Sequence, residues 1–204
     1  MITLFRIENP SPNVLKVAIM LEETGLPHRV EIVERLRGAM PEGSYAEVSP
    51  NGTTPAIRDE QTGAALFESA AILHYLAEKS GQFLPAEPRA RADVMKWLLF
   101  EAANLCPTLI ELYHCLMDVT GDIPDSIVAR HQDRARRHCA ILDAQLKTGP
   151  YLCGAYSIAD IGLYPWTAVL ADLADIHLAD YPRIAAWAKT METRPAVRQA
   201  LDAG

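Results

Sequence analysis

An acid and a hydroxyl stand next to each other where a predicted strand gives way to a predicted helix, in the segment LFESA over residues 66–70. The N-terminus of a helix offers unpaired backbone N–H groups and the positive end of the helix dipole, and both favour a bound carboxylate. Glu68 can then pair with an ammonium group while Ser69 and the helix N–H groups hold a carboxylate. Together they suit the α-amino acid end of a small ligand. The alternative is that Ser69 is simply the helix N-cap.

A proline directly before a predicted strand is the second feature, in TTPAI over residues 53–57. Proline cannot donate to a strand ladder, so it belongs at the start of a strand or on an edge. If the bond between Thr54 and Pro55 is cis, Thr54 turns its backbone N–H and C=O outward, where an extended peptide can pair with them like an added strand. An ordinary trans proline in a turn is the alternative, because only about 5% of X–Pro bonds are cis.

The loop NPSPN, residues 9–13, contributes a hydroxyl and two amides just ahead of a predicted helix. A thiolate is stabilised at a helix N-terminus, so Ser11 and Asn13 are candidate contacts for a sulfur atom. The alternative is a Pro/Asn turn in which Ser11 or Asn13 caps the helix. Lys16 faces the same region on a helical reading, but we expect it to be a solvated surface lysine.

The elements that position these residues follow from the hydrophobic periodicity of the first 80 residues. The pattern predicts strands and helices in the order β-α-β-loop-β-β-α. Their ranges are a strand at 2–7, a helix at 14–24, a strand at 28–33, two strands around a turn at 59–63, and a helix at 69–79. Gly25 and Pro27 end the first helix. This order predicts a thioredoxin-like sheet with helices on both faces.

Beyond residue 80 the pattern changes. Residues 81–89 carry two prolines and a glycine, which predicts a linker. The rest is predicted to be helical, with a kink or break at Pro107 and a helix capping box at Ser157 and Asp160. The predicted helices are 91–117, 125–147, 182–192 and 195–203. The fold class is therefore an α/β thioredoxin-like domain over residues 1–80 followed by an all-α domain over residues 90–204.

Composition excludes several classes of function. The chain of 204 residues has a net charge of −7 and a pI near 5.3, which leaves no electrostatic footprint for nucleic acid. No apolar run reaches the ~20 residues of a membrane helix. Most of the arginine cluster is predicted to be a solvated helix face: Arg130, Arg134, Arg136 and Arg137. The cysteines are widely spaced without a CxxC pair, which predicts buried thiols in a reducing compartment, cytoplasm by default, and neither a disulfide framework nor a zinc site: Cys106, Cys115, Cys139 and Cys153.

Four segments resemble glutathione transferases in their order and spacing: SPNVLKVAIMLEE at 11–23, SPNGTTPAI at 49–57, LFESAAILHYLAEKSG at 66–81 and SIADI at 157–161. The resemblance covers nearly the whole chain and is greatest to the bacterial Nu class, which itself resembles fungal nitrogen-regulator proteins. It implies a thioredoxin-like glutathione-binding domain, an all-helical substrate-binding domain and a cytoplasmic homodimer. Glutathione would be the co-substrate, with no metal.

The resemblance also implies roles for single residues. Pro55 would be cis, and the Thr54 backbone would pair with the cysteinyl part of glutathione. Glu68 and Ser69 would hold the γ-glutamyl end. Met40 falls about where a polar contact to the glycine carboxylate is expected, so that end of the ligand would be held in another way.

Ser11 and Asn13 are the catalytic candidates near the glutathione sulfur. The first loop has no cysteine, which argues against a mixed disulfide with the protein. Arg130 is the candidate for a basic residue that reaches a second glutathione. The second-substrate pocket would draw on Phe100, Asn104, Tyr113 and His114. Aromatic residues at helical spacing are more often core than pocket wall, and this alternative stays open.

The implied function is activation of the glutathione thiol for attack on a disulfide or a small electrophile. The likeness to the Nu class favours disulfide reduction, with glutathione supplying both thiols. The alternative is a non-catalytic glutathione-binding, assembly or regulatory module, because a fold does not fix a function. The intact pairs Glu68–Ser69 and Thr54–Pro55 favour ligand binding.

Overall fold

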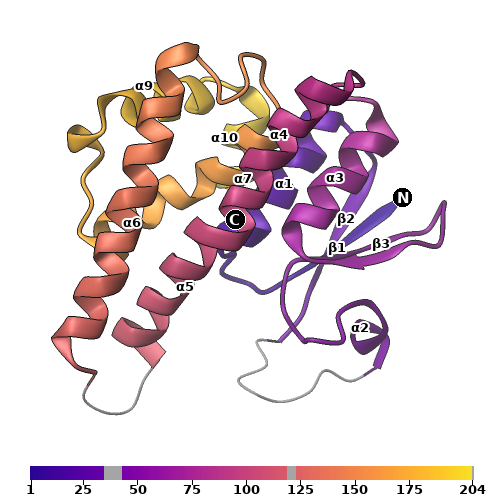
Figure 1. Ribbon diagram of the computed structural model, residues 1–204. Helices are drawn as coiled ribbons and strands as arrows, with labels where there is room; N and C mark the ends of the chain where they lie inside the picture. Colours follow the sequence, from indigo (N-terminus) through magenta and orange to yellow (C-terminus); the bar gives the residue numbers. More distant parts are fainter. Residues whose placement is uncertain (35–42, 119–122, 204) are drawn as a thin grey trace. The chain divides into compact units, whose positions relative to one another are not determined.

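The computed structural model describes residues 1–34, 43–118 and 123–203 of the chain (Figure 1). They form two compact units, one of residues 1–84 and 192–204 and one of residues 85–191. Residues 192–204, which the sequence pattern groups with the helical domain, thus join the α/β unit in the structure.

A four-stranded sheet organises the first unit, in the order β2-β1-β3-β4. Its strands are β1 (Ile2–Arg6), β2 (His28–Ile32), β3 (Ala56–Asp59) and β4 (Ala65–Phe67). β1 runs parallel to β2 and antiparallel to β3, and β3 pairs antiparallel with β4. The four predicted strands and the thioredoxin-like order are confirmed. A short helix, α2 (Gly43–Val48), lies in the stretch predicted to be a loop, since six residues are too few to show a helical period.

Helix α1 (Pro12–Thr24) connects β1 to β2 and packs against α3 (Ser69–Ser80) and α10 (Pro195–Asp202). It begins with a proline, whose missing N–H is not needed in the first turn. It ends at Gly25, which adopts the left-handed conformation with φ 63° that closes many helices. Among its fully buried residues, Val14, Val17 and Leu21 recur at three- and four-residue spacing.

Helix α10 belongs to the first unit because it is amphipathic and because an ion pair anchors its start. Val197 and Ala200 are buried on its apolar side. Arg194, just before the helix, donates hydrogen bonds of 2.6 and 2.8 Å to the two carboxylate oxygens of Glu23, near the end of α1. A bidentate arginine–carboxylate pair is both stronger and more specific in its geometry than a single hydrogen bond.

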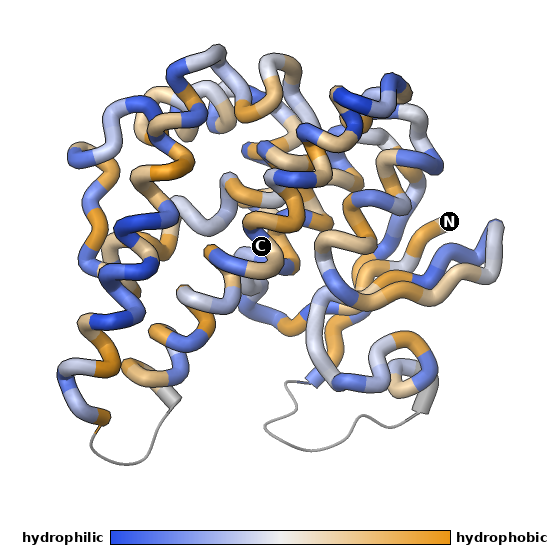
Figure 2. Tube along the Cα trace, in the orientation of Figure 1, coloured by the Kyte–Doolittle hydropathy of each residue, from blue (hydrophilic) through white to orange (hydrophobic). Residues whose placement is uncertain are grey.

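The second unit is all-helical, as predicted. Its helices are α4 (Pro88–Phe100), α5 (Cys106–Tyr113), α6 (Asp125–Gln145), α7 (Ile158–Leu163), α8 (Leu170–Ala174) and α9 (Pro182–Glu192). Shorter helical segments are η1 (Glu101–Leu105), η2 (His114–Asp118), η3 (Leu146–Thr148), η4 (Tyr164–Val169) and η5 (Leu178–Asp180). Helix α6 is mainly hydrophilic with apolar residues interspersed (Figure 2). In the described parts of the chain, no helix is both long and apolar enough to cross a membrane.

The predicted break near Pro107 takes the form of a π-helical segment, η1, between α4 and α5. Pro107 has no N–H to donate into the turn before it, and a wider turn there accommodates the missing bond. The predicted capping box at Ser157 and Asp160 is confirmed at the start of α7. The buried Asp160 carboxylate accepts hydrogen bonds from the Leu152 and Ser157 N–H groups and from the indole of Trp187. Burial still raises the pKa of Asp160, against the effect of these donors.

Asp59, at the end of β3, ties the β3–β4 turn to α3. Its fully buried carboxylate accepts a hydrogen bond of 2.6 Å from the Tyr75 hydroxyl and lies 2.8 Å from the Lys79 ammonium. The Gln61 N–H donates to the other oxygen at 2.9 Å. Burial alone would raise the pKa of Asp59, but the hydrogen bonds from Lys79, Tyr75 and Gln61 outweigh it and hold the pKa well below its usual range.

Asp59→Asn should destabilise the chain by about 2 kcal/mol near neutral pH, because three donors lose a charged acceptor. The stabilisation is present above the pKa of the unfolded chain, about 3.9, and is lost as pH falls through the lower folded pKa. Urea unfolding at several pH values should therefore show the free-energy difference between the two proteins narrowing toward acid. A difference that stays constant with pH would contradict this assignment. The exposed Asp180→Asn is the control, with no expected effect.

Candidate functional site

Ser11 stands at the start of α1, and its side chain is not used as a cap. Its backbone is extended, with φ −72° and ψ 164°. Its carbonyl accepts hydrogen bonds of 2.9 and 3.0 Å from the N–H groups of Val14 and Leu15. The hydroxyl makes no capping hydrogen bond. The structure therefore does not support the alternative in which the Ser11 side chain caps the helix. Ser11 is half-buried, so part of it faces solvent.

Lys16, in the second turn of α1, is buried, so the expectation of a solvated lysine is wrong. Its side chain is completely buried. Its ammonium lies 2.5 Å from Oδ1 of Asn13 and 3.3 Å from Oγ of Ser69. Ser69 in turn donates to the same Asn13 oxygen at 3.3 Å. A lysine is buried only where hydrogen-bond partners meet its ammonium, and here they come from α1 and from the start of α3.

Glu68 and Ser69 lie at the junction of β4 and α3, and the helix begins at Ser69, as predicted. The N-cap is Glu68, without a capping hydrogen bond from its side chain, and Ser69 is the first residue of the helix. The alternative in which Ser69 is the N-cap is therefore wrong, and its hydroxyl is directed to Asn13 instead. Glu68 has φ 69° and ψ 110°, which is rare for a residue with a side chain. Backbone strain of this kind gathers at ligand-binding positions.

The peptide bond between Thr54 and Pro55 is cis, as predicted. The preceding carbonyl, of Thr53, accepts hydrogen bonds from the Tyr45 hydroxyl at 2.7 Å and from the Ser49 hydroxyl at 2.8 Å. These bonds tie the loop to α2. Thr54 itself is half-buried, between this anchored carbonyl and the buried proline ring.

The sheet register brings these segments together. Ala56 of β3 pairs with Phe67 of β4, so the residues before Ala56 and the residues after Phe67 emerge at the same end of the hairpin. The cis-proline loop and the start of α3 are therefore neighbours. Hydrogen bonds from Ser69 and Lys16 then connect α3 to Asn13 in the first loop. One small unit thus offers a backbone edge, an exposed acid and a polar cluster beside the N-termini of two helices.

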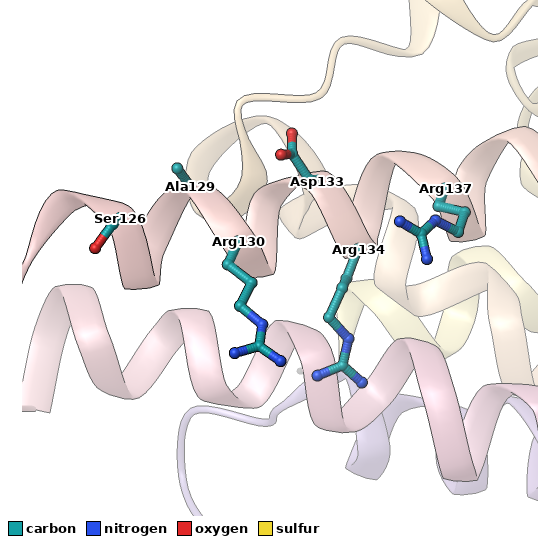
Figure 3. A pocket seen from close by; sticks show the side chains of 6 residues that line it. All are labelled: Ser126, Ala129, Arg130, Asp133, Arg134 and Arg137. Carbon is teal, nitrogen blue, oxygen red and sulfur yellow. The ribbon is translucent and has the colours of Figure 1, made fainter.

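Met40 lies outside the described residues. Arg130 is exposed on α6, in the second unit, beside an open hollow of about 680 Å³. The hollow is lined by Ser126, Ala129, Arg130, Asp133, Arg134 and Arg137 (Figure 3). In Figure 3 the side chains of Arg130 and Arg134 extend to one side of α6, while Asp133 points away from them. Asp133 pairs with Arg136 instead, at 3.1 Å.

The four residues predicted for the second-substrate pocket also lie in the second unit. Phe100 is half-buried and packs edge-on against the rings of Trp97 and His138, at centroid distances of 5.4 and 5.5 Å. Such contacts are typical of core packing. The rings of Tyr113 and His114 contact each other at 5.8 Å, and His114 is exposed. Asn104 is half-buried, and its carbonyl accepts the Thr108 hydroxyl at 2.7 Å. Their role in binding stays a prediction.

The four cysteines are free, as predicted, but the prediction that they are buried holds for Cys139 alone, since the other three are half-buried. Burial raises the pKa of the Cys139 thiol to about 12 and that of the Cys153 thiol to about 11. A thiol is nucleophilic as the thiolate, so these two are inert near neutral pH. Over the residues that the structure describes, no group of three or more His, Cys, Asp or Glu side chains is arranged to hold a metal ion.

Comparison with known proteins finds similar chains along nearly the whole length of this one. A disulfide-bond oxidoreductase of Escherichia coli, YfcG, is 37% identical over 198 residues, which cover 94% of this chain and 91% of that protein. The crystal structure of a glutathione transferase family member from Pseudomonas fluorescens, with two glutathione bound, matches with a TM-score of 0.88 at 32% identity. The match covers 98% of this chain and 92% of the P. fluorescens chain. A glutathione transferase from Pseudomonas putida, with one glutathione disulfide bound per subunit, matches with a TM-score of 0.86 at 30% identity. That match covers 98% of this chain and 90% of the P. putida chain.

The domain families agree as well. Residues 10–79 match the family described as glutathione S-transferase, N-terminal domain, and residues 125–190 match glutathione S-transferase, C-terminal domain. The first match contains the whole polar cluster around Lys16 together with the cis-proline loop. The two matches and the 37% identity show that this chain belongs to the glutathione S-transferase family.

Proposed function

We propose that this chain is an enzyme that uses glutathione to reduce disulfides, with the first glutathione held by its α/β unit. The observation that carries the proposal is the hydrogen bond between Asn13, in the first loop, and Ser69, at the start of α3. It joins the position assigned to the sulfur with the position assigned to the γ-glutamyl carboxylate. The E. coli relative is named a disulfide-bond oxidoreductase, and the P. putida relative holds glutathione disulfide, which supports this reaction class.

The proposed binding mode gives each polar group of glutathione a partner. The exposed Glu68 carboxylate pairs with the γ-glutamyl ammonium. The first N–H groups of α3, beginning with the backbone N–H of Ser69, hold the adjacent carboxylate, where the helix dipole favours an anion. The Thr54 backbone pairs with the cysteinyl part like a strand added to an edge. The sulfur then lies toward Ser11 and Asn13 at the start of α1.

Activation of the thiol is the chemical task of this site. A free thiol has a pKa near ~8.5, so most glutathione is protonated at neutral pH. Hydrogen bonds from the Ser11 hydroxyl and the Asn13 amide, together with the N-terminus of α1, favour the thiolate. Lowering the pKa by one unit takes about 1.4 kcal/mol, which one charge-assisted hydrogen bond can supply.

The reaction then consists of two thiol–disulfide exchanges. The bound thiolate attacks one sulfur of the substrate disulfide, forms a mixed disulfide with it and releases the other sulfur as a thiolate, which takes up a proton. A second glutathione thiolate attacks the glutathione sulfur of the mixed disulfide and releases the second substrate thiol. Two glutathiones are oxidised to one glutathione disulfide for each substrate disulfide reduced.

Arg130 is the proposed ligand for a carboxylate of the second glutathione. Its guanidinium is exposed in an arginine-lined hollow, and a planar guanidinium suits bidentate binding of a carboxylate. The P. fluorescens relative with two glutathione bound supports two sites per subunit. Conjugation of glutathione to a small electrophile is the second candidate, supported by the transferase family itself. We also propose a homodimer in the cytoplasm, on the basis of the family resemblance.

Ser11→Ala and Asn13→Ala should each lower kcat/KM for glutathione-dependent reduction of a small dialkyl disulfide. The residue nearer the sulfur should show the larger loss, about tenfold to a hundredfold, because a donor to the reacting anion is removed. The rate of glutathione disulfide formation is the measurement. Asn9→Ala is the matched control, since Asn9 lies in the same loop and is exposed. Undiminished activity in both variants would refute the assignment of this loop to the sulfur.

Titration calorimetry with reduced glutathione tests the number of sites. We expect two sites per subunit, and Arg130→Ala should weaken one of them by about tenfold, the loss of one charge-assisted contact. Arg89→Ala removes an exposed arginine elsewhere in the second unit and should change neither site. A single site that Arg130→Ala leaves unchanged would favour conjugation with an unidentified second substrate. No binding at millimolar glutathione would overturn the enzyme proposal and leave an assembly module.

A further inference from the structure

Lys16 has the features of a functional residue rather than of an ordinary surface lysine. It is among the largest side chains of the chain that are fully buried. Burial of an ammonium is costly unless hydrogen bonds replace its water. An apolar residue of similar length would fill the same space between α1 and α3 without that cost. A buried lysine beside a proposed anion site therefore calls for a chemical explanation.

The hydrogen bonds of Lys16 fix the orientation of the Asn13 amide. An ammonium group is a donor only, so the Asn13 atom 2.5 Å away must be the carbonyl oxygen, Oδ1. The Ser69 hydroxyl donates to the same oxygen at 3.3 Å. With its oxygen held by two donors, the amide presents its NH₂ group in the other direction. Asn13 is thereby oriented as a hydrogen-bond donor, the role that stabilisation of a thiolate requires.

The charge of Lys16 also lies between the two anionic parts of the proposed ligand. Two of its hydrogen-bond partners, Asn13 and Ser69, lie at the positions assigned to the sulfur and to the γ-glutamyl carboxylate. The N-termini of α1 and α3 add partial positive charge at the same place. Glu8 and Glu68, two acidic residues on the adjoining segments, are both exposed to solvent.

We infer that Lys16 is a positioning residue that orients the Asn13 amide toward the glutathione sulfur and supplies positive charge beneath both anions of the bound ligand. This inference rests on the proposed function, since it assumes glutathione at this site. The inferred role of Lys16 is to orient the amide and to supply charge, not to take the thiol proton. The proton of the thiol passes to solvent, and the thiolate remains opposite the oriented amide.

The test compares wild type, Lys16→Met and Lys16→Gln by the pH dependence of the ultraviolet absorbance of the bound glutathione thiolate. Loss of the ammonium should raise the apparent pKa of the bound thiol by about one unit or more, the size expected when a nearby charge is removed. Lys16→Gln keeps a donor and a polar chain, so it serves if Lys16→Met does not fold. It should keep part of the Asn13 orientation and show a smaller shift. The exposed Lys189→Met removes one charge elsewhere and should leave the pKa unchanged.

A double-mutant cycle separates positioning from a purely structural role. If Lys16 acts through Asn13, the thiol pKa shifts of Lys16→Gln and Asn13→Ala should not add in the double variant. Calorimetry with S-methylglutathione, which has no thiol, reports the carboxylate end alone and should show several-fold weaker binding in Lys16→Gln. A folded variant with reduced thermal stability but an unchanged thiol pKa would overturn the inference. Failure of the wild type to bind glutathione would instead overturn the proposed function, so the two failures are distinguishable.

Discussion

The burial of one ammonium group, that of Lys16, is the constraint on which the arrangement of the candidate site depends. A charge removed from water must be met by hydrogen bonds, and Asn13 on α1 and Ser69 at the start of α3 each accept one. If the start of α1 or the start of α3 shifted, Lys16 would lose a hydrogen bond to Asn13 or Ser69, and an unsatisfied buried donor is costly. The apolar packing of α1 on α3 places the lysine, and the lysine then fixes the polar groups around it.

Sequence reasoning succeeded where a local pattern has one structural outcome. The glycine after α1 and the capping box at Ser157 act over a few residues, and the structure confirms both. The cis bond before Pro55 was implied by the family resemblance, since the local pattern alone favoured a trans proline. Lys16 was misjudged because a lysine in a helix is usually solvated, and only the packing of α3 against α1 buries it. Its spacing of three residues from Asn13 was the one available signal. The pairing of Arg194 with Glu23 spans 171 residues, and no local pattern encodes it.

The chemistry of this chain does not depend on its buried thiols. Cys139 and Cys153 lie where burial keeps them protonated, and the loop at the start of α1 has no cysteine. A nucleophile supplied by a bound tripeptide is replaced at every turnover, so an overoxidised thiol leaves with its ligand and does not inactivate the protein. The protein then contributes what it can keep fixed, which is orientation and charge.

The packing of α10 on α1 has a consequence for the order in which the chain folds. The second unit is one continuous stretch of sequence, whereas the first is closed by residues that follow it. During synthesis, all of residues 85–191 emerge before Arg194 can reach Glu23. The unit that is made first is therefore completed last, and until then α1 exposes the apolar side that α10 later covers. A chaperone that shields this face of the nascent chain would act for the whole time in which the helical unit is being translated.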